Sequence, residues 1–188
     1  MGTNYRMLLP AIWILAGLAA SAAAYADAAA DARKTITSIY TKRDAAEQKK
    51  DLEGSFSGIS PNFVFITKDG QKGDVKLLKR RISPIFALMQ NVKAKSQVQK
   101  FAVNGKNATA TVKQHIEMLV VNGQSQMPQK FVADETSEDL WTKTASGWLQ
   151  TRMKTLSETA ALDGKTINER VNLADGTIKK PGATRKSK

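Results

Sequence analysis

Four long segments with alternating apolar and polar side chains, separated by short turns, fill most of the second half of the chain. We predict strands over residues 95–103, 108–121, 130–143 and 148–158. In the second segment Val112 and Met118 stand at even positions and Lys113 and Glu117 at odd ones, so one face is dry and the other wet. Consecutive strands joined by short turns pair antiparallel, so we expect a four-stranded antiparallel meander.

The first part of the chain is predicted to be a long helix. From Asp27 to about Glu53 the sequence is rich in alanine and contains neither proline nor glycine, which favours a helix. Ile36 and Tyr40 belong to one narrow apolar stripe along it. The charged remainder, which includes Arg43, is expected to face water.

A strand and a broken helix follow this first helix. Residues 62–67 are rich in strand formers and end at the turn signal Asp69-Gly70. Residues 75–89 have helical spacing, but Pro84 does not suit a helix interior, so we predict two short helices or one kinked helix. The order predicts the α+β class, with a long N-terminal helix and a broken helix pair packed on a curved antiparallel sheet.

Residues 1–26 have the layout of a secretory signal peptide. Arg6 is the one charge among them, an apolar run extends from Leu8 to Leu18, and Ala24-Tyr25-Ala26 provides a small-x-small cleavage site. We therefore expect cleavage after Ala26 and a periplasmic or secreted protein. An uncleaved anchor helix is the alternative, and it is less favoured because the apolar run is shorter than the about 20 residues that span a bilayer.

Charge and cysteine content narrow the classes of function. The formal net charge is +12, and the chain has no cysteine, which excludes disulfides, thiolate metal sites and cysteine nucleophiles. Basic residues gather without acidic ones near the C-terminus, at Lys179, Lys180, Arg185, Lys186 and Lys188. We divide the chain into a signal peptide (1–26), one folded domain (27–162) and a basic tail (163–188) that is predicted to be disordered.

Several short stretches, in this order, carry a family resemblance. They are Tyr40…Arg43-Asp44-Ala45, Ile59-Ser60-Pro61-Asn62-Phe63-Val64-Phe65 before Asp69-Gly70, Asp139-Leu140-Trp141, and Gly147-Trp148. Through their order and spacing, residues 30–160 resemble the nuclear-transport-factor-2-like superfamily, more narrowly an exported bacterial member of its SnoaL-like branch. The resemblance implies a cone, in which a curved sheet wraps the helices around an apolar pocket. Relatives use that pocket as an enzyme site, as a ligand-binding hole or only as core.

Six residues form the predicted ligand-binding set. They are Tyr40, Phe65, Phe86, Met118, Trp141 and Arg152. The apolar members are of the kind that walls small-molecule sites, although plain core is the simpler interpretation of each. Arg152 lies four residues after Trp148, hence on the same face by strand alternation. Facing inward it would anchor an anionic ligand, and facing outward it would be a solvated charge.

No catalytic residue, metal ligand or cofactor is predicted. His115 stands on the polar side of its strand and is interpreted as a surface residue without the further ligands that a metal site needs. Tyr40, Asp44 and Glu47 lie along one side of the first helix, where they could act as acid and base. The simpler interpretation is that Asp44 and Glu47 pair with nearby basic residues on the helix surface. The clustered strand acids are interpreted as solvated: Asp134, Glu135, Glu138 and Asp139.

Three functions stay open at this point. The first is an exported, non-catalytic domain that binds a small apolar or amphipathic molecule. The second is an isomerase, dehydratase or cyclase in which Tyr40 donates a proton and Asp44 is the base. The third is binding of an anionic envelope surface or polymer through Lys79-Arg80-Arg81 and the tail. Nucleic acid is not expected as a partner because of export, and a homodimer is implied by resemblance alone.

Overall fold

The computed structural model describes residues 9–121, 127–167, 170–172 and 177–179, with side chains over 25–121 and 127–167. Its helices are α1 (Leu9–Gln48), α2 (Leu52–Ser55) and α3 (Val75–Leu88). Its strands are β1 (Ile59–Ile66), β2 (Lys72–Asp74), β3 (Met89–Asn104), β4 (Asn107–Val120), β5 (Gln129–Thr144), β6 (Gly147–Leu162), β7 (Lys165–Thr166), β8 (Arg170–Asn172) and β9 (Thr177–Lys179). Residues 1–8 of the expected signal peptide and 180–188 of the expected tail lie outside the described residues.

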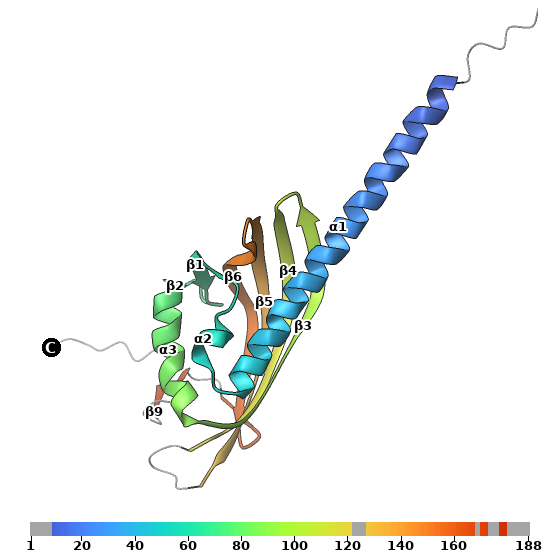
Figure 1. Ribbon diagram of the computed structural model, residues 1–188. Helices are drawn as coiled ribbons and strands as arrows, with labels where there is room; N and C mark the ends of the chain where they lie inside the picture. Colours follow the sequence, from blue (N-terminus) through green and yellow to red (C-terminus); the bar gives the residue numbers. More distant parts are fainter. Residues whose placement is uncertain (1–8, 122–126, 168–169, 173–176, 180–188) are drawn as a thin grey trace, which may run out of the picture.

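The predicted antiparallel meander is confirmed as β3 to β6. The main sheet has the order β2-β1-β6-β5-β4-β3, with β7 on β6. β1 pairs with β6 in parallel, so the sheet is mixed, and the prediction of a wholly antiparallel sheet is wrong at this pair. A parallel pair needs a long connection, which α3 and the strands β3, β4 and β5 supply. The sheet curves around the helices (Figure 1), and the predicted α+β cone is confirmed.

Helix α1 crosses the inner side of the sheet, where it packs mainly on β3 (Figure 1). Ala32, Ile36 and Tyr40 follow each other at four-residue spacing and are all buried, as an amphipathic helix requires. The helix ends at Gln48, earlier than predicted, because Lys50 adopts a φ of 57°. The side chain of Asp51 then caps the separate helix α2 by accepting a hydrogen bond from the Gly54 N–H.

The N-terminal part of α1 begins before the predicted start at Asp27 and extends beyond the sheet (Figure 1). Between residues 25 and 31 the side chains are exposed except for the half-buried Ala29, and Ala32 is the first buried one. Within the described residues, no helix combines the length and the hydropathy needed to cross a membrane.

Helix α3 is one continuous helix, so the prediction of a broken helix pair is wrong. Its N-terminus is capped by Asp74, whose side chain accepts from the Leu77 N–H at 2.7 Å. Pro84 removes the hydrogen bond to the Arg80 carbonyl, but both residues are exposed, so that carbonyl can be solvated by water.

Two hydrophobic clusters form the core on the inner side of the sheet. The first joins α1 to β4, β5 and β6 around Ile36, Tyr40, Trp141 and Trp148. The second joins α3 to β3 and β4 around Phe86, Met89, Val92, Met118 and Val120. Residues from both clusters line the cavity described next, so the cavity lies where the two clusters meet.

Candidate functional site

A cavity of about 190 Å³ lies between the helices and the inner side of the sheet. Its larger polar residues come from α1 and the meander strands, and we call them the polar wall: Tyr40, Arg43, Glu47, Gln114, Glu135, Asp139 and Gln150. Three serines add smaller polar groups: Ser55, Ser96 and Ser137. Its apolar residues come mainly from β1, α3 and the end of α2, and we call them the apolar wall: Phe56, Ile59, Phe63, Leu78, Ile82 and Phe86. Val112 and Met153 add apolar surface from the sheet. The cavity thus has one apolar wall and one strongly polar wall.

Tyr40 and Asp139 form the most buried polar contact of the site. The Tyr40 hydroxyl donates a hydrogen bond to Asp139 Oδ2, and Asp139 is only 1% exposed. Burial raises the pKa of Asp139 to about 6, although the Tyr40 hydrogen bond and the Arg43 charge oppose that rise. Burial, reinforced by Asp139, also raises the pKa of Tyr40, so its hydroxyl keeps its proton. Trp141 packs edge-on against the Tyr40 ring, with centroids 5.5 Å apart, and supports its position.

Arg43 contacts several groups around this pair, through hydrogen bonds and through the faces of two aromatic rings. Its Nε donates to the Ser57 carbonyl at 2.7 Å, and its Nη1 donates to Gln150 Oε1 at 2.6 Å. The guanidinium also lies over the rings of Tyr40 (5.6 Å) and Trp141 (5.3 Å). Its Nη2 is buried and has no hydrogen-bond partner among the described residues. Arg43 is 8% exposed, so the prediction that it faces water is wrong.

Glu47 and Glu135 bring two more carboxylates to the polar wall. Glu47 accepts from the Gln114 side-chain amide at 3.2 and 3.3 Å, and Glu135 accepts from the Thr155 hydroxyl at 2.8 Å. Burial, reinforced by Asp44, raises the pKa of Glu47 to about 7. Burial also raises the pKa of Glu135. A carboxyl group with a pKa near neutrality can take up or release a proton under ordinary conditions.

Asp44 has a structural role instead of the acid–base role considered for it. Its two carboxylate oxygens accept from the backbone N–H and the hydroxyl of Ser96, each at 2.7 Å. It is 7% exposed and is not among the residues that line the cavity. Asp44 therefore fastens α1 to β3, and the interpretation that Asp44 and Glu47 pair with basic residues on the helix surface is wrong.

The six residues predicted to bind ligand fall into two groups. Tyr40 and Phe86 line the cavity. Trp141 lies behind Tyr40 in the core, and Met118 lies in the second core cluster. The ring of Phe65 occupies the space over Gly73, where a Cβ atom would meet it at 2.3 Å, and lies beside α3 outside the cavity lining. A role for these residues in ligand binding stays a prediction.

Arg152 faces away from the cavity because of a β-bulge. Gln150 pairs with Trp141, but the next residue pair along the ladder is Arg152 with Leu140, so Thr151 is the extra residue of β6. The extra residue reverses the alternation that placed Arg152 on the face of Trp148. Met153 lines the cavity in its place, and Arg152 forms an ion pair with Glu138 at 3.3 Å.

Sequence reasoning missed most of the polar wall, although signals for it were present. Asp139 stands two residues before Trp141 on one strand and so shares its inward face. Arg43 stands three residues after Tyr40, on the same side of α1. The acids at 134–139 are therefore of two kinds: Glu135 and Asp139 point inward, while Asp134 lies on the outer face.

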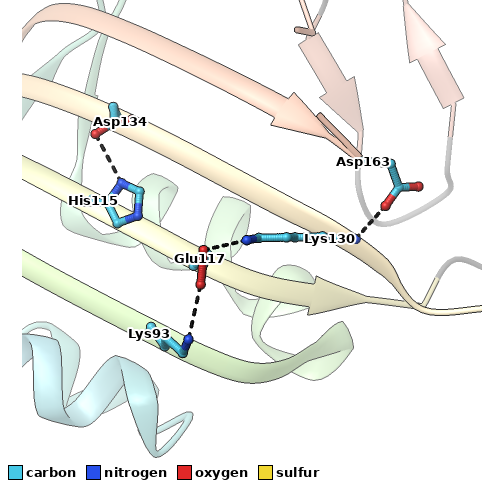
Figure 2. A network of polar contacts seen from close by, with 6 residues as sticks. All are labelled: Lys93, His115, Glu117, Lys130, Asp134 and Asp163. Atoms are coloured by element: carbon cyan, nitrogen blue, oxygen red, sulfur yellow. Dashed lines mark hydrogen bonds and ion pairs between the residues drawn. The ribbon is translucent and has the colours of Figure 1, made fainter. Parts of the chain in front are cut away.

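The outer face of the sheet carries a separate ionic network (Figure 2). His115 Nδ1 lies 3.2 Å from Asp134 Oδ1, and Glu117 bridges Lys130 at 2.7 Å and Lys93 at 3.3 Å. The placement of His115 at the surface is thus confirmed. In the part of the chain that the structure describes, no group of three or more His, Asp or Glu side chains could hold a metal ion.

Comparison of the sequence with protein-family models and with curated proteins finds no match. Solved structures do match. The protein Kfla4162 from Kribbella flavida is 11% identical with a TM-score of 0.58, over 78% of this chain and 98% of that one. A nuclear transport factor 2-like superfamily protein from Salmonella enterica serovar Typhimurium is 16% identical with a TM-score of 0.52, over 67% of this chain and 90% of that one.

An enzyme is also among the structures that match. A hexachlorocyclohexane dehydrochlorinase (LinA, type 2) is 8% identical with a TM-score of 0.54, over 69% of this chain and 88% of that one. At such identities the likeness concerns the fold, which hosts enzymes as well as proteins of unknown function. The chain therefore has the cone fold of the nuclear-transport-factor-2-like superfamily, as its sequence predicts.

Proposed function

We propose that this protein binds a small amphipathic molecule about the size of one substituted ring. The observation that supports this is the cavity itself, in which an apolar wall from β1 and α3 meets a polar wall from α1 and the meander. Apolar surface with a few placed polar groups is the usual composition of small-molecule sites. The apolar wall would bury the body of the ligand, and the polar wall would orient it.

The volume limits the size of the ligand. An apolar protein cavity of about 150 Å³ holds one benzene molecule. The cavity of about 190 Å³ therefore has room for a six-membered ring with a short substituent. Two buried polar atoms on its lining residues, Arg43 Nη2 and Asp139 Oδ1, have no hydrogen-bond partner among the described residues. A ligand with a polar substituent could supply a partner, and burial without one costs about 1–3 kcal/mol per group.

The test is binding of benzyl alcohol to the full chain, measured by calorimetry or by NMR of the protein amides. Its eight non-hydrogen atoms, at about 0.6 kcal/mol each, give a Kd of about 0.3 mM. Val112→Phe should fill part of the cavity and abolish binding, and Leu78→Phe should do the same from α3 if the first variant does not fold. Val64→Phe is the matched control, because Val64 is exposed. Binding that survives both cavity variants would refute the proposal.

A second candidate is an enzyme that transfers a proton, and the carboxyl of Glu47 on the cavity wall favours it. A general base works best when its pKa lies near the working pH, and the pKa of Glu47 is raised to about 7. Glu47 thus takes the place of Asp44 as the candidate base. Exchange of the α-hydrogens of cyclohexanone for deuterium should accelerate with pH through about 7 and be lost in Glu47→Gln. Equal rates with and without the protein would exclude this candidate.

Export through a cleaved signal peptide is also a proposal. Removal of residues 1–26 would take away no described core residue, because Ala32 is the first buried one. Among the described side chains of that segment, Tyr25 donates a hydrogen bond to the Val103 carbonyl, and its own side chain is exposed. Mass spectrometry of the protein recovered from its host should find a chain that begins at Asp27. A chain recovered with the segment intact would support the anchor alternative.

A further inference from the structure

We propose that the polar group of the ligand is a protonated amine, so that the cavity selects small ring-bearing organic cations over neutral or acidic molecules of the same shape. This rests on the proposed function and adds the chemical class of the ligand. It follows from the balance of charged groups on the polar wall, taken together with an unpartnered acceptor atom there.

Carboxylates outnumber cations around the cavity. Glu47, Glu135 and Asp139 line it, whereas Arg43 is the one basic side chain among the described lining residues. With every group ionised, the lining thus carries more negative than positive charge. Buried charge without an opposite partner is costly, and a cation placed in the cavity would offset that cost.

Two of the three guanidinium nitrogens of Arg43 are committed to other groups, and the third, Nη2, is buried without a hydrogen-bond partner among the described residues. Its Nε and Nη1 donate to Ser57 and Gln150, and its plane lies against the rings of Tyr40 and Trp141. Its charge lowers the pKa of both Asp139 and Glu47, but one positive charge cannot balance three ionised acids. We call Glu47 and Glu135 the carboxylate pair.

The carboxylate pair is held by neutral donors alone among the described side chains. The Gln114 side-chain amide donates hydrogen bonds to Glu47, and the Thr155 hydroxyl donates one to Glu135. Such donors fix the orientation of a carboxylate without neutralising its charge. Neighbouring acids also disfavour ionisation of Glu47, since Asp44 and Glu135 both raise its pKa.

Asp139 provides a second observation that points to a donor on the ligand. It is 1% exposed and lines the cavity, and its Oδ1 has no hydrogen-bond partner among the described residues, although the neighbouring Ser137 side chain helps to lower the pKa of this carboxyl. An ammonium group carries three donors and no acceptor, which suits a wall of carboxylate oxygens. A carboxylate ligand would instead meet three acids, with only Nη2 of one guanidinium left to donate to it.

The experiment compares three probes of one shape, benzylamine, benzyl alcohol and benzoate, by calorimetry on the full chain at pH 7.5. Charge-assisted hydrogen bonds are stronger than neutral ones by enough to change affinity about tenfold. Benzylamine should therefore bind at least about tenfold more tightly than benzyl alcohol, and benzoate should bind most weakly.

Glu47→Gln isolates the effect of the charge. It should weaken benzylamine about tenfold and benzyl alcohol by a clearly smaller factor, because the alcohol can lose a hydrogen bond to Glu47 but no charge–charge attraction. Glu135→Gln is the second variant if Glu47→Gln does not fold. Glu117→Gln is the matched control, because Glu117 lies on the outer face between Lys93 and Lys130 (Figure 2) and should change neither affinity.

The outcomes separate this inference from the function on which it rests. Three results would overturn the selection of cations and leave the ligand-binding function standing. They are equal affinity for benzylamine and benzyl alcohol, tighter binding of benzoate than of either, and equal weakening of both by Glu47→Gln. If none of the three probes binds, both are overturned.

Discussion

Replacement of Glu47 by glutamine should stabilise the protein in a pH-dependent way. Burial and the Asp44 charge raise the pKa of Glu47 from 4.5 to about 7, while Gln114 and Arg43 oppose that rise. A raised pKa means that the folded state favours the protonated acid, so this stabilisation is present below about pH 4.5 and is lost as the pH rises through 7. The difference between 4.5 and 7 corresponds to about 3 kcal/mol. The charge of Glu135 contributes to the pKa of Glu47, and the site can relax around the substitution. We therefore expect Glu47→Gln to raise the free energy of unfolding by about 1–3 kcal/mol above pH 7.

The assay is urea unfolding of wild type and Glu47→Gln at pH 4 and pH 8. At pH 4 the acid is mostly protonated in both the folded and the unfolded state and resembles the amide, so the two free energies of unfolding should nearly agree. At pH 8 the variant should be more stable by the amount given above. Glu117→Gln should show no such gain, because Lys130 and Lys93 lower the pKa of Glu117. Equal differences at both pH values, or a less stable variant at pH 8, would refute the reasoning.

Three further predictions concern the neighbouring groups. Tyr40→Phe removes the donor to the buried Asp139, so it should lower the free energy of unfolding by about 1–3 kcal/mol in urea titrations at pH 8, and an unchanged value would contradict the buried contact. Asp44→Ala removes two hydrogen bonds to Ser96 and should cost about 2–4 kcal/mol, whereas Asp44→Asn, which keeps an acceptor, should cost less. Benzylamine affinity should rise between pH 6 and pH 8 as Glu47 ionises, whereas an affinity that falls over this range would place the amine elsewhere.

The fold could be predicted because its signals are periodic. The alternation of apolar and polar residues along β4 predicts a sheet with one buried face. In the structure Val112 and Met118 are buried on that face. The parallel pairing of β1 with β6 could not be predicted, because that pair depends on how distant segments meet. No local pattern in residues 59–66 specifies the direction of a partner strand.

The site was harder to predict than the fold for two physical reasons. A single inserted residue, Thr151, turns Arg152 outward and Met153 inward, and no turn signal marks that bulge in the sequence. The burial of Arg43 depends on partners that are remote in sequence, namely Gln150 and the rings that flank it. Composition alone assigns an arginine to the surface, because it cannot show such partners.

The central claim is that the cavity takes up a ring on its apolar wall and a polar group on its polar wall. A crystal structure of the protein with 4-bromobenzyl alcohol, with the bromine located by its anomalous scattering, tests this directly. The account predicts bromine in contact with Ile82 and Phe86, and the hydroxyl within hydrogen-bond distance of Glu47 or Asp139. Bromine against the polar wall, or a cavity that stays free of the compound in crystals soaked well above its Kd, would contradict it.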